Sequence, residues 1–123
     1  KNFLIAEDNG INLDMLKELL KEEGAACDCA KNGMAAVDLF RHSKKGQYDL
    51  IFMDVQMPDM DGYEATRAIR QMKHPDAKDI PIVAMTANAF SNDVKAAFDC
   101  GMNAHLAKPV NIDRIKDIVA NFT

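Results

Sequence analysis

Four short apolar runs in this chain each end at polar or charged residues. The runs are Phe3-Leu4-Ile5-Ala6, Leu50-Ile51-Phe52-Met53, Ile82-Val83-Ala84-Met85 and Ala104-His105-Leu106-Ala107. Each run has the length of a buried strand, and segments with helical apolar spacing lie between the runs. Strands that alternate with helices are typical of one parallel sheet with helices on both faces. The pattern therefore predicts an α/β fold.

A fifth strand and five helices complete the predicted pattern. Residues 25–30 alternate small apolar side chains with Asp28, as an edge strand with one wetter face would. The first helix begins near Asn9 to Asn12. The apolar residues that it should turn inward are Ile11, Met15, Leu16, Leu19 and Leu20. Those that the fourth helix should turn inward are Phe90, Val94, Ala97 and Phe98.

The resulting five βα units predict a single doubly wound, flavodoxin-like (βα)5 domain over residues 1–123. The alternation alone does not supply the order of the strands. The order 2-1-3-4-5, known for sheets of this kind, places the first and third strands side by side at the centre, and it is the order we expect. Because the chain opens almost directly into a strand and closes just after a helix, we expect it to be a domain of a longer protein.

The composition argues against several classes of protein. With a formal net charge of −4, the chain lacks the basic surplus of a protein that binds nucleic acid or a membrane surface. No apolar run approaches the roughly 20 residues of a membrane span. Cys27, Cys29 and Cys100 are an odd number and lack the four ligands of a structural zinc site. We therefore expect buried, reduced thiols and a cytoplasmic location.

Polar residues stand directly after the strands of this predicted sheet. Glu7 and Asp8 follow the first strand, Asp54 the third, Thr86 the fourth and Lys108 the fifth. In a parallel sheet these positions share one rim, which is where ligands bind. Three neighbouring carboxylates repel one another unless a cation neutralises them, and an all-oxygen ligand set selects a hard cation such as Mg²⁺. An acidic rim that is only solvated, or used only for helix caps, is the plainer interpretation.

The residue types at this rim also suit phosphoryl chemistry. A carboxylate can act as a nucleophile toward phosphorus, and Asp54 ends the most central strand, so it is the best candidate for a phosphoacceptor. Lys108 would bind a phosphoryl oxygen as a point charge, and Thr86 would donate its hydroxyl to another.

Several short motifs together resemble the receiver domain of two-component response regulators. They are Glu7-Asp8, Asp54-Val55-Gln56-Met57-Pro58 with Asp61-Gly62, Thr86-Ala87, and Lys108-Pro109. The resemblance covers essentially the whole chain, with the motifs in the family's order and spacing, and its specificity comes from their combination. The sequence of residues 53–58 and 101–105 looks most like that of receivers attached to hybrid sensor histidine kinases.

The resemblance implies a phosphorelay function. Asp54 would accept a phosphoryl group from a phosphohistidine of a sensor histidine kinase, and the domain would catalyse its own phosphorylation and dephosphorylation. It would then change its surface or pass the group to a histidine phosphotransfer domain. The implied metal is Mg²⁺ (or Mn²⁺), bound by Asp8, Asp54 and the backbone carbonyl of Gln56, while Glu7 acts mainly through water.

For the phosphoryl group, the resemblance implies contacts from Lys108, Thr86 and the Ala87 backbone, together with a cis Lys108-Pro109 bond. Thr86 would move toward the phosphate as part of a switch. The family couples this threonine to an aromatic residue on the fifth strand, where this chain has His105. Gln56 and Asn88 flank the site at positions that influence phosphoryl lifetime. The isolated domain is expected to be monomeric.

Other functions fit the sequence less well. Asp59-Met60-Asp61-Gly62 superficially resembles the acidic motif of haloacid-dehalogenase-type phosphatases, but that motif directly follows a strand, whereas this segment lies in a loop. An EF-hand would need further ligands after Gly62. A flavin-binding domain would need a phosphate-cradling loop where Glu7 and Asp8 stand. A receiver-like module that no longer takes phosphate would usually have lost an acid, the lysine or the threonine.

Overall fold

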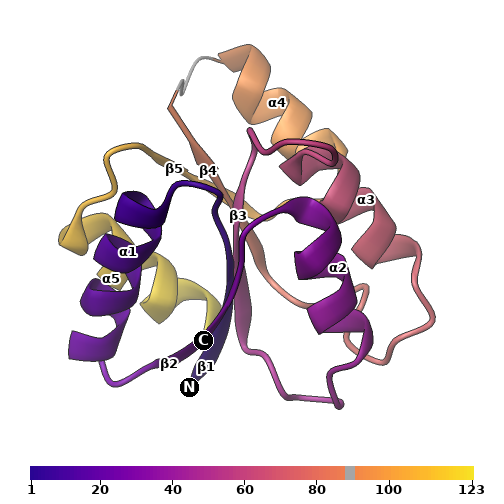
Figure 1. Ribbon diagram of the computed structural model, residues 1–123, viewed down its shortest axis with the longest axis horizontal. Helices are drawn as coiled ribbons and strands as arrows, with labels where there is room; N and C mark the ends of the chain where they lie inside the picture. The colour runs from indigo at the N-terminus through magenta and orange to yellow at the C-terminus, as the bar shows by residue number, and fades with distance from the viewer. Residues whose placement is uncertain (88–90) are drawn as a thin grey trace.

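Five strands and five helices alternate along the residues that the computed structural model describes, 1–87 and 91–123 (Figure 1). The strands are β1 (Asn2–Ala6), β2 (Ala26–Ala30), β3 (Leu50–Asp54), β4 (Ile82–Thr86) and β5 (Ala104–Ala107). The helices are α1 (Gly10–Glu22), α2 (Gly33–Arg41), α3 (Gly62–Gln71), α4 (Ser91–Asp99) and α5 (Ile112–Phe122). The predicted alternation of strands and helices is confirmed.

The strands form one parallel sheet in the order β2-β1-β3-β4-β5, as expected. β1, which Glu7 and Asp8 follow, and β3, which ends at Asp54, are therefore neighbours. Their register continues evenly across the sheet, with Met53 beside Ala6 and Thr86 beside Ala107. As a result, the carboxyl ends of four strands reach the same rim.

Two apolar layers cover the sheet (Figure 1). Helices α1 and α5 pack on one face, and α2, α3 and α4 pack on the other. Strand side chains alternate between these layers, so that Phe3 and Ile5 face α1 and α5 while Leu4 and Ala6 face the opposite helices. Because both faces are covered, β1, β3 and β4 each carry four consecutive apolar residues, which explains the continuous runs in the sequence.

Capping side chains begin the helices close to the rim. The Asn9 side chain accepts hydrogen bonds from the backbone N–H groups of Ile11 and Asn12 at the start of α1. Asp61 and Glu64 form a reciprocal capping box at the start of α3. Each such cap contributes about 1 kcal/mol and fixes where the preceding loop must end.

Some predicted inward positions are wrong. On α1, Ile11 is 75% exposed and Met15 is 47% exposed, and Leu13 is buried instead. The predicted stripe and the true one share Leu16 and Leu20, so helical spacing alone could not separate them. On α4, Phe98 is 50% exposed, because the buried face of this helix is set by Ala97. Phe90 lies outside the described residues.

The cysteines are less enclosed than expected on the edge strand. Cys27 and Cys29 are half-buried, whereas Cys100 is buried, and all three are free thiols. Partial burial still raises the pKa of Cys27 to about 11 and raises that of Cys29. These thiols therefore stay protonated and weakly reactive near neutral pH.

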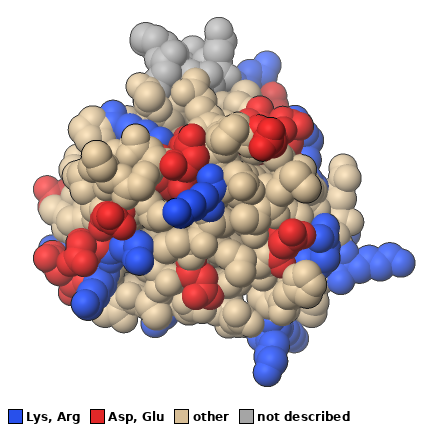
Figure 2. All heavy atoms as spheres, in the orientation of Figure 1, with Lys and Arg blue, Asp and Glu red and all other residues tan. Residues whose placement is uncertain are grey.

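The surface carries charges of both signs. Figure 2 shows acidic and basic side chains interspersed on one face, separated by uncharged surface. Among the described residues, no helix has the length and apolar character needed to cross a bilayer.

One buried hydroxyl gives a direct test of the packing. Thr66 on α3 is fully buried, and its Oγ1 has no hydrogen-bond partner among the described residues. An unpaired buried hydroxyl costs roughly 1–3 kcal/mol, so Thr66→Val, which keeps the shape, should raise the free energy of unfolding by about 1 kcal/mol. Urea denaturation measures this. Thr66→Ser keeps the hydroxyl and should lower stability by about 1 kcal/mol; a valine variant less stable than the parent would contradict the assignment.

Candidate functional site

The predicted rim residues meet where the carboxyl ends of the strands line up. Asp54 is the last residue of β3, and Glu7 and Asp8 directly follow β1. Thr86 ends β4, and Lys108 follows β5. Their convergence follows from the strand order, which makes β1 and β3 neighbours.

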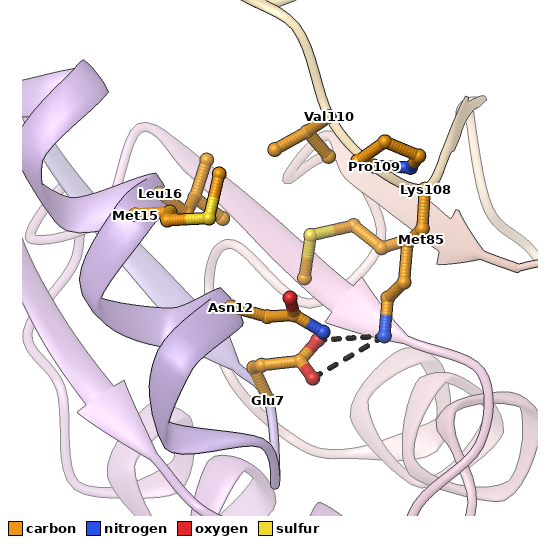
Figure 3. Close-up of a pocket in the computed structure, with 8 residues that line it drawn as sticks. All are labelled: Glu7, Asn12, Met15, Leu16, Met85, Lys108, Pro109 and Val110. Atoms are coloured by element: carbon orange, nitrogen blue, oxygen red, sulfur yellow. Dashed lines mark hydrogen bonds and ion pairs between the residues drawn. The ribbon is translucent and has the colours of Figure 1, made fainter.

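An ion-pair network occupies the centre of the rim. The Lys108 Nζ lies 2.9 Å from Asp54 Oδ2 and 2.9 Å from Glu7 Oε2, and it donates a hydrogen bond of 3.2 Å to Glu7 Oε1. Figure 3 shows the lysine side chain reaching down to the Glu7 carboxylate. Glu7 and Asp54 are each only 2% exposed. One ammonium is therefore shared by two buried carboxylates that come from different strands.

The charge state of Asp54 reflects a balance of opposing effects. Burial raises the pKa of its carboxyl group, while the hydrogen bonds from Lys108 and from the backbone N–H of Gln56 act in the opposite direction. The Gln56 N–H lies 3.1 Å from Asp54 Oδ1. Burial alone would lower the pKa of Lys108, but the hydrogen bonds that its ammonium donates to the two carboxylates raise it. Burial has the larger effect, so the pKa of Asp54 is raised above that of an ordinary aspartate.

Three carboxylates at the rim are arranged as a metal site would require. Oxygen atoms of Glu7, Asp8 and Asp54 all lie within 4.8 Å of one another. Asp8 is the exposed member of the three. The hollow beside these acids is also lined by Gln56, Ala87 and Lys108. An all-oxygen set of hard donors, open to water on one side, fits Mg²⁺ chemistry.

The backbone around Asp54 leaves no space for a larger residue at position 62. The Gly62 N–H donates to the Val55 carbonyl oxygen at 3.2 Å, so the start of α3 lies directly behind the end of β3. A Cβ placed on Gly62 would collide with the carbonyl oxygen of Asp54. On the other side, Lys108 N–H donates to the Thr86 carbonyl at 2.7 Å, and the Lys108-Pro109 bond is cis, as expected.

The sequence of this chain matches a known protein family. The family model for the response regulator receiver domain matches residues 3–120. This chain belongs to the response regulator receiver family. The receiver is 41% identical over 124 residues to hybrid signal transduction histidine kinase B of Dictyostelium discoideum, a match that covers 94% of this chain. The chain spans only 6% of that kinase's length.

Two solved structures are similar in fold and sequence. The receiver domain of sensor histidine kinase PA1611 from Pseudomonas aeruginosa PAO1, crystallised with magnesium in its active site cleft, has a TM-score of 0.88 and 33% identity. That match covers 99% of this chain and 96% of the other. The receiver domain of Ssk1 from Saccharomyces cerevisiae, crystallised with the histidine phosphotransfer protein Ypd1, has a TM-score of 0.85 and 33% identity, covering 98% and 87% of the two chains.

The remaining predicted residues of the receiver are placed as follows. Thr86 is buried at the end of β4, and Ala87 and Gln56 line the hollow. His105 is half-buried and pairs with Ala84, two positions before Thr86, so both side chains lie on the same face of the sheet. Asn88 lies outside the described residues.

The structure does not favour the phosphatase reading of residues 59–62. The Asp61 side chain accepts the Glu64 N–H and caps α3, and Asp59 lies in the loop after β3 with a φ of 68°.

Sequence reasoning missed the pairing of Glu7 with Lys108. It assigned the lysine to a phosphoryl oxygen and the glutamate to a water-mediated metal contact. The available signal was electrostatic, because three carboxylates at one rim need a counter-charge, and Lys108 follows a strand that ends at the same rim.

Removing this counter-charge should destabilise the receiver. Lys108→Met leaves Glu7 and Asp54 buried without a positively charged partner, so without Mg²⁺ we expect the free energy of unfolding to fall by about 3 kcal/mol at pH 7. Because burial already raises the pKa of Asp54, stability should return as the pH falls and the Asp54 carboxyl group takes up a proton. Denaturation in urea with a chelator, at several pH values, measures both effects.

Lys116→Met is the matched control. Lys116 Nζ lies 3.7 Å from Glu23 Oε1, and its side chain is 56% exposed. This variant should lose less than about 0.5 kcal/mol. Equal losses in the two variants would show that the buried pair has no special role.

Proposed function

We propose that residues 1–123 form one receiver domain that accepts a phosphoryl group on Asp54 in a Mg²⁺-dependent reaction. The observation that carries this proposal is the buried Asp54 carboxylate, held by the Lys108 ammonium next to two further carboxylates. A nucleophile, a phosphate-binding cation and a metal ligand set are thus present within one rim.

The metal would be held by Asp8, Asp54 and the Gln56 carbonyl, with Glu7 binding through water. A bound divalent cation supplies positive charge that screens the acids and stabilises the phosphoryl oxygens. The magnesium described in the PA1611 receiver supports this choice, and Mn²⁺, which also takes oxygen ligands, should substitute.

In the reaction, a carboxylate oxygen of Asp54 forms a bond to phosphorus while the bond from phosphorus to the donor's imidazole nitrogen breaks. The imidazole leaves with the electron pair of that bond. Lys108 moves its ammonium from the carboxylates to a phosphoryl oxygen, and Thr86 and the Ala87 N–H donate to the others. Water later hydrolyses the acyl phosphate, and Gln56 and Asn88 control its access. The receiver thereby catalyses both its phosphorylation and its dephosphorylation.

The phosphoryl group then acts as a signal. Thr86 moves toward the new oxygens, and His105, on the same face of the sheet, responds to that movement. The result is an altered surface, or transfer of the phosphoryl group to a histidine phosphotransfer domain.

The partners are a sensor histidine kinase and a histidine phosphotransfer domain, and the setting is cytoplasmic. The Ssk1 receiver, a relative in structure, is described in complex with Ypd1, which is such a phosphotransfer protein.

Apolar side chains suited to docking flank the rim: Ile11 and Met15 are exposed on α1, and Pro109 and Val110 line the same small pocket as Met15 (Figure 3). The isolated domain acts as a monomer without binding nucleic acid.

The central test is covalent labelling of Asp54. Incubation with Mg²⁺ and acetyl phosphate should add one phosphoryl group to the parent, measured as intact mass, and none to Asp54→Asn, because an amide is not a nucleophile toward phosphorus. A chelator should abolish labelling, and Mn²⁺ should restore it.

Asp59→Asn is the matched control for this test. Asp59 is exposed in the loop after β3, and its positive φ of 68° suits asparagine. This variant should label like the parent. A parent that neither labels nor binds beryllofluoride would instead be a receiver-like module that no longer takes phosphate.

A second test separates docking from chemistry. Ile11→Glu and Met15→Glu place charges on the apolar flank, so we expect transfer from a phosphorylated histidine phosphotransfer domain that labels the parent to slow at least tenfold. Labelling by acetyl phosphate should be unchanged. Leu39→Glu, at the end of α2 away from the rim, is the control. If both donors slowed equally, these residues would support the site itself rather than the partner.

A further inference from the structure

A partly buried clasp centred on Arg70 joins α3 to the end of α4. Arg70 lies in the last turn of α3, and its guanidinium donates to the Gly101 carbonyl from both Nε (3.0 Å) and Nη2 (2.8 Å). Nη2 also donates to Asn103 Oδ1 at 2.9 Å, and Nη1 donates to the Ala77 carbonyl at 2.9 Å. No ion pair with a carboxylate is found for this guanidinium among the described residues, so its donors serve these oxygens.

Asn103 extends the clasp to the first residue of β4. Its side-chain oxygen accepts both the Arg70 hydrogen bond and one from the Ile82 N–H at 2.9 Å. Its backbone N–H donates to the Ile82 carbonyl at 2.8 Å. Ile82 begins the strand that Thr86 ends, so the clasp lies at the opposite end of β4 from the phosphoacceptor rim.

The clasp supplies what the end of α4 lacks. The last turn of α4 has no basic residue to complement the negative end of the helix dipole, and Arg70 brings a cation to this end from another helix. Gly101 follows with a φ of +108°, and a Cβ there would approach Arg70 Cγ to 3.1 Å. Ala97 and Cys100 are buried on the same stretch. This end of α4 is thus fixed by charge, hydrogen bonds and packing together.

The opposite end of α4 follows Thr86 and Ala87 along the chain. In the proposed function, on which this inference rests, those residues contact the phosphoryl group. We propose that Arg70 is the positioning residue about which α4 turns, so that a shift at Thr86 moves the helix as a rigid element. Without the clasp, the end of α4 would fray when Thr86 shifts, and the helix would not move as a rigid element.

The variants separate this role from general stability. Arg70→Gln removes both the positive charge and the planar set of guanidinium N–H donors. Arg70→Lys keeps the charge but not this planar set of donors. Arg67→Gln removes the same charge from an exposed position one turn earlier on α3. Val37→Ala weakens the core on α2, away from the clasp. Each variant is labelled with acetyl phosphate and Mg²⁺, and its hydrogen exchange is measured with and without beryllofluoride.

We expect every variant to form the phosphoryl adduct. In Arg70→Gln, basal exchange of residues 98–103 should rise about tenfold, and the beryllofluoride-induced change in α4 should fall at least threefold. Arg67→Gln and Val37→Ala should keep the parent's response. If Arg70→Gln does not fold, Arg70→Lys should show the same losses.

The clasp hypothesis is overturned if Arg70→Gln responds like the parent, or if Val37→Ala loses the response to the same degree. A parent that forms no adduct refutes the proposed function separately. In that case basal exchange at residues 98–103 still decides whether Arg70 holds the end of α4, because that measurement needs no phosphate.

Discussion

The Lys108 ammonium, shared between the carboxylates of Glu7 and Asp54, is the interaction on which this structure depends. Two carboxylates buried to this extent would each cost several kcal/mol without a counter-charge. Lys108 supplies that charge and ties the ends of β1, β3 and β5 together. The same ammonium would have to serve the phosphoryl group, so stability of the resting domain and reactivity of Asp54 draw on one cation.

The fold is readable from the sequence because burial on both faces of a parallel sheet demands continuous apolar strands. β1, β3 and β4 therefore stand out, and the polar residue after each strand marks the rim. Which side of each helix packs against the sheet was harder to predict. On α1, the stripe through Ile11 and Met15 and the true one through Leu13 share their other members, and only packing against the sheet distinguishes them.

The site was predictable where residue type and strand position coincide, as for Asp54 and Lys108. It was not predictable where a long side chain reaches acceptors that have no sequence signal. Arg70 binds backbone carbonyls such as that of Gly101, 31 residues away, and any residue could present such a carbonyl. The roles of Gln56, Ala87 and His105 come from family resemblance, because backbone contacts and coupled motions leave little trace in spacing.

Two residues that form an ion pair at the rim lie far apart in the sequence, which affects when this ion pair can form during synthesis. Glu7 and Lys108 are separated by 101 positions, yet they meet in the same ion pair. Contacts between distant parts of a chain form only after the intervening segments are in place. A nascent chain on the ribosome would thus carry Asp54 and its acidic neighbours long before the lysine emerges. The ion pair between Glu7 and Lys108 can therefore form only when β5 has joined the sheet.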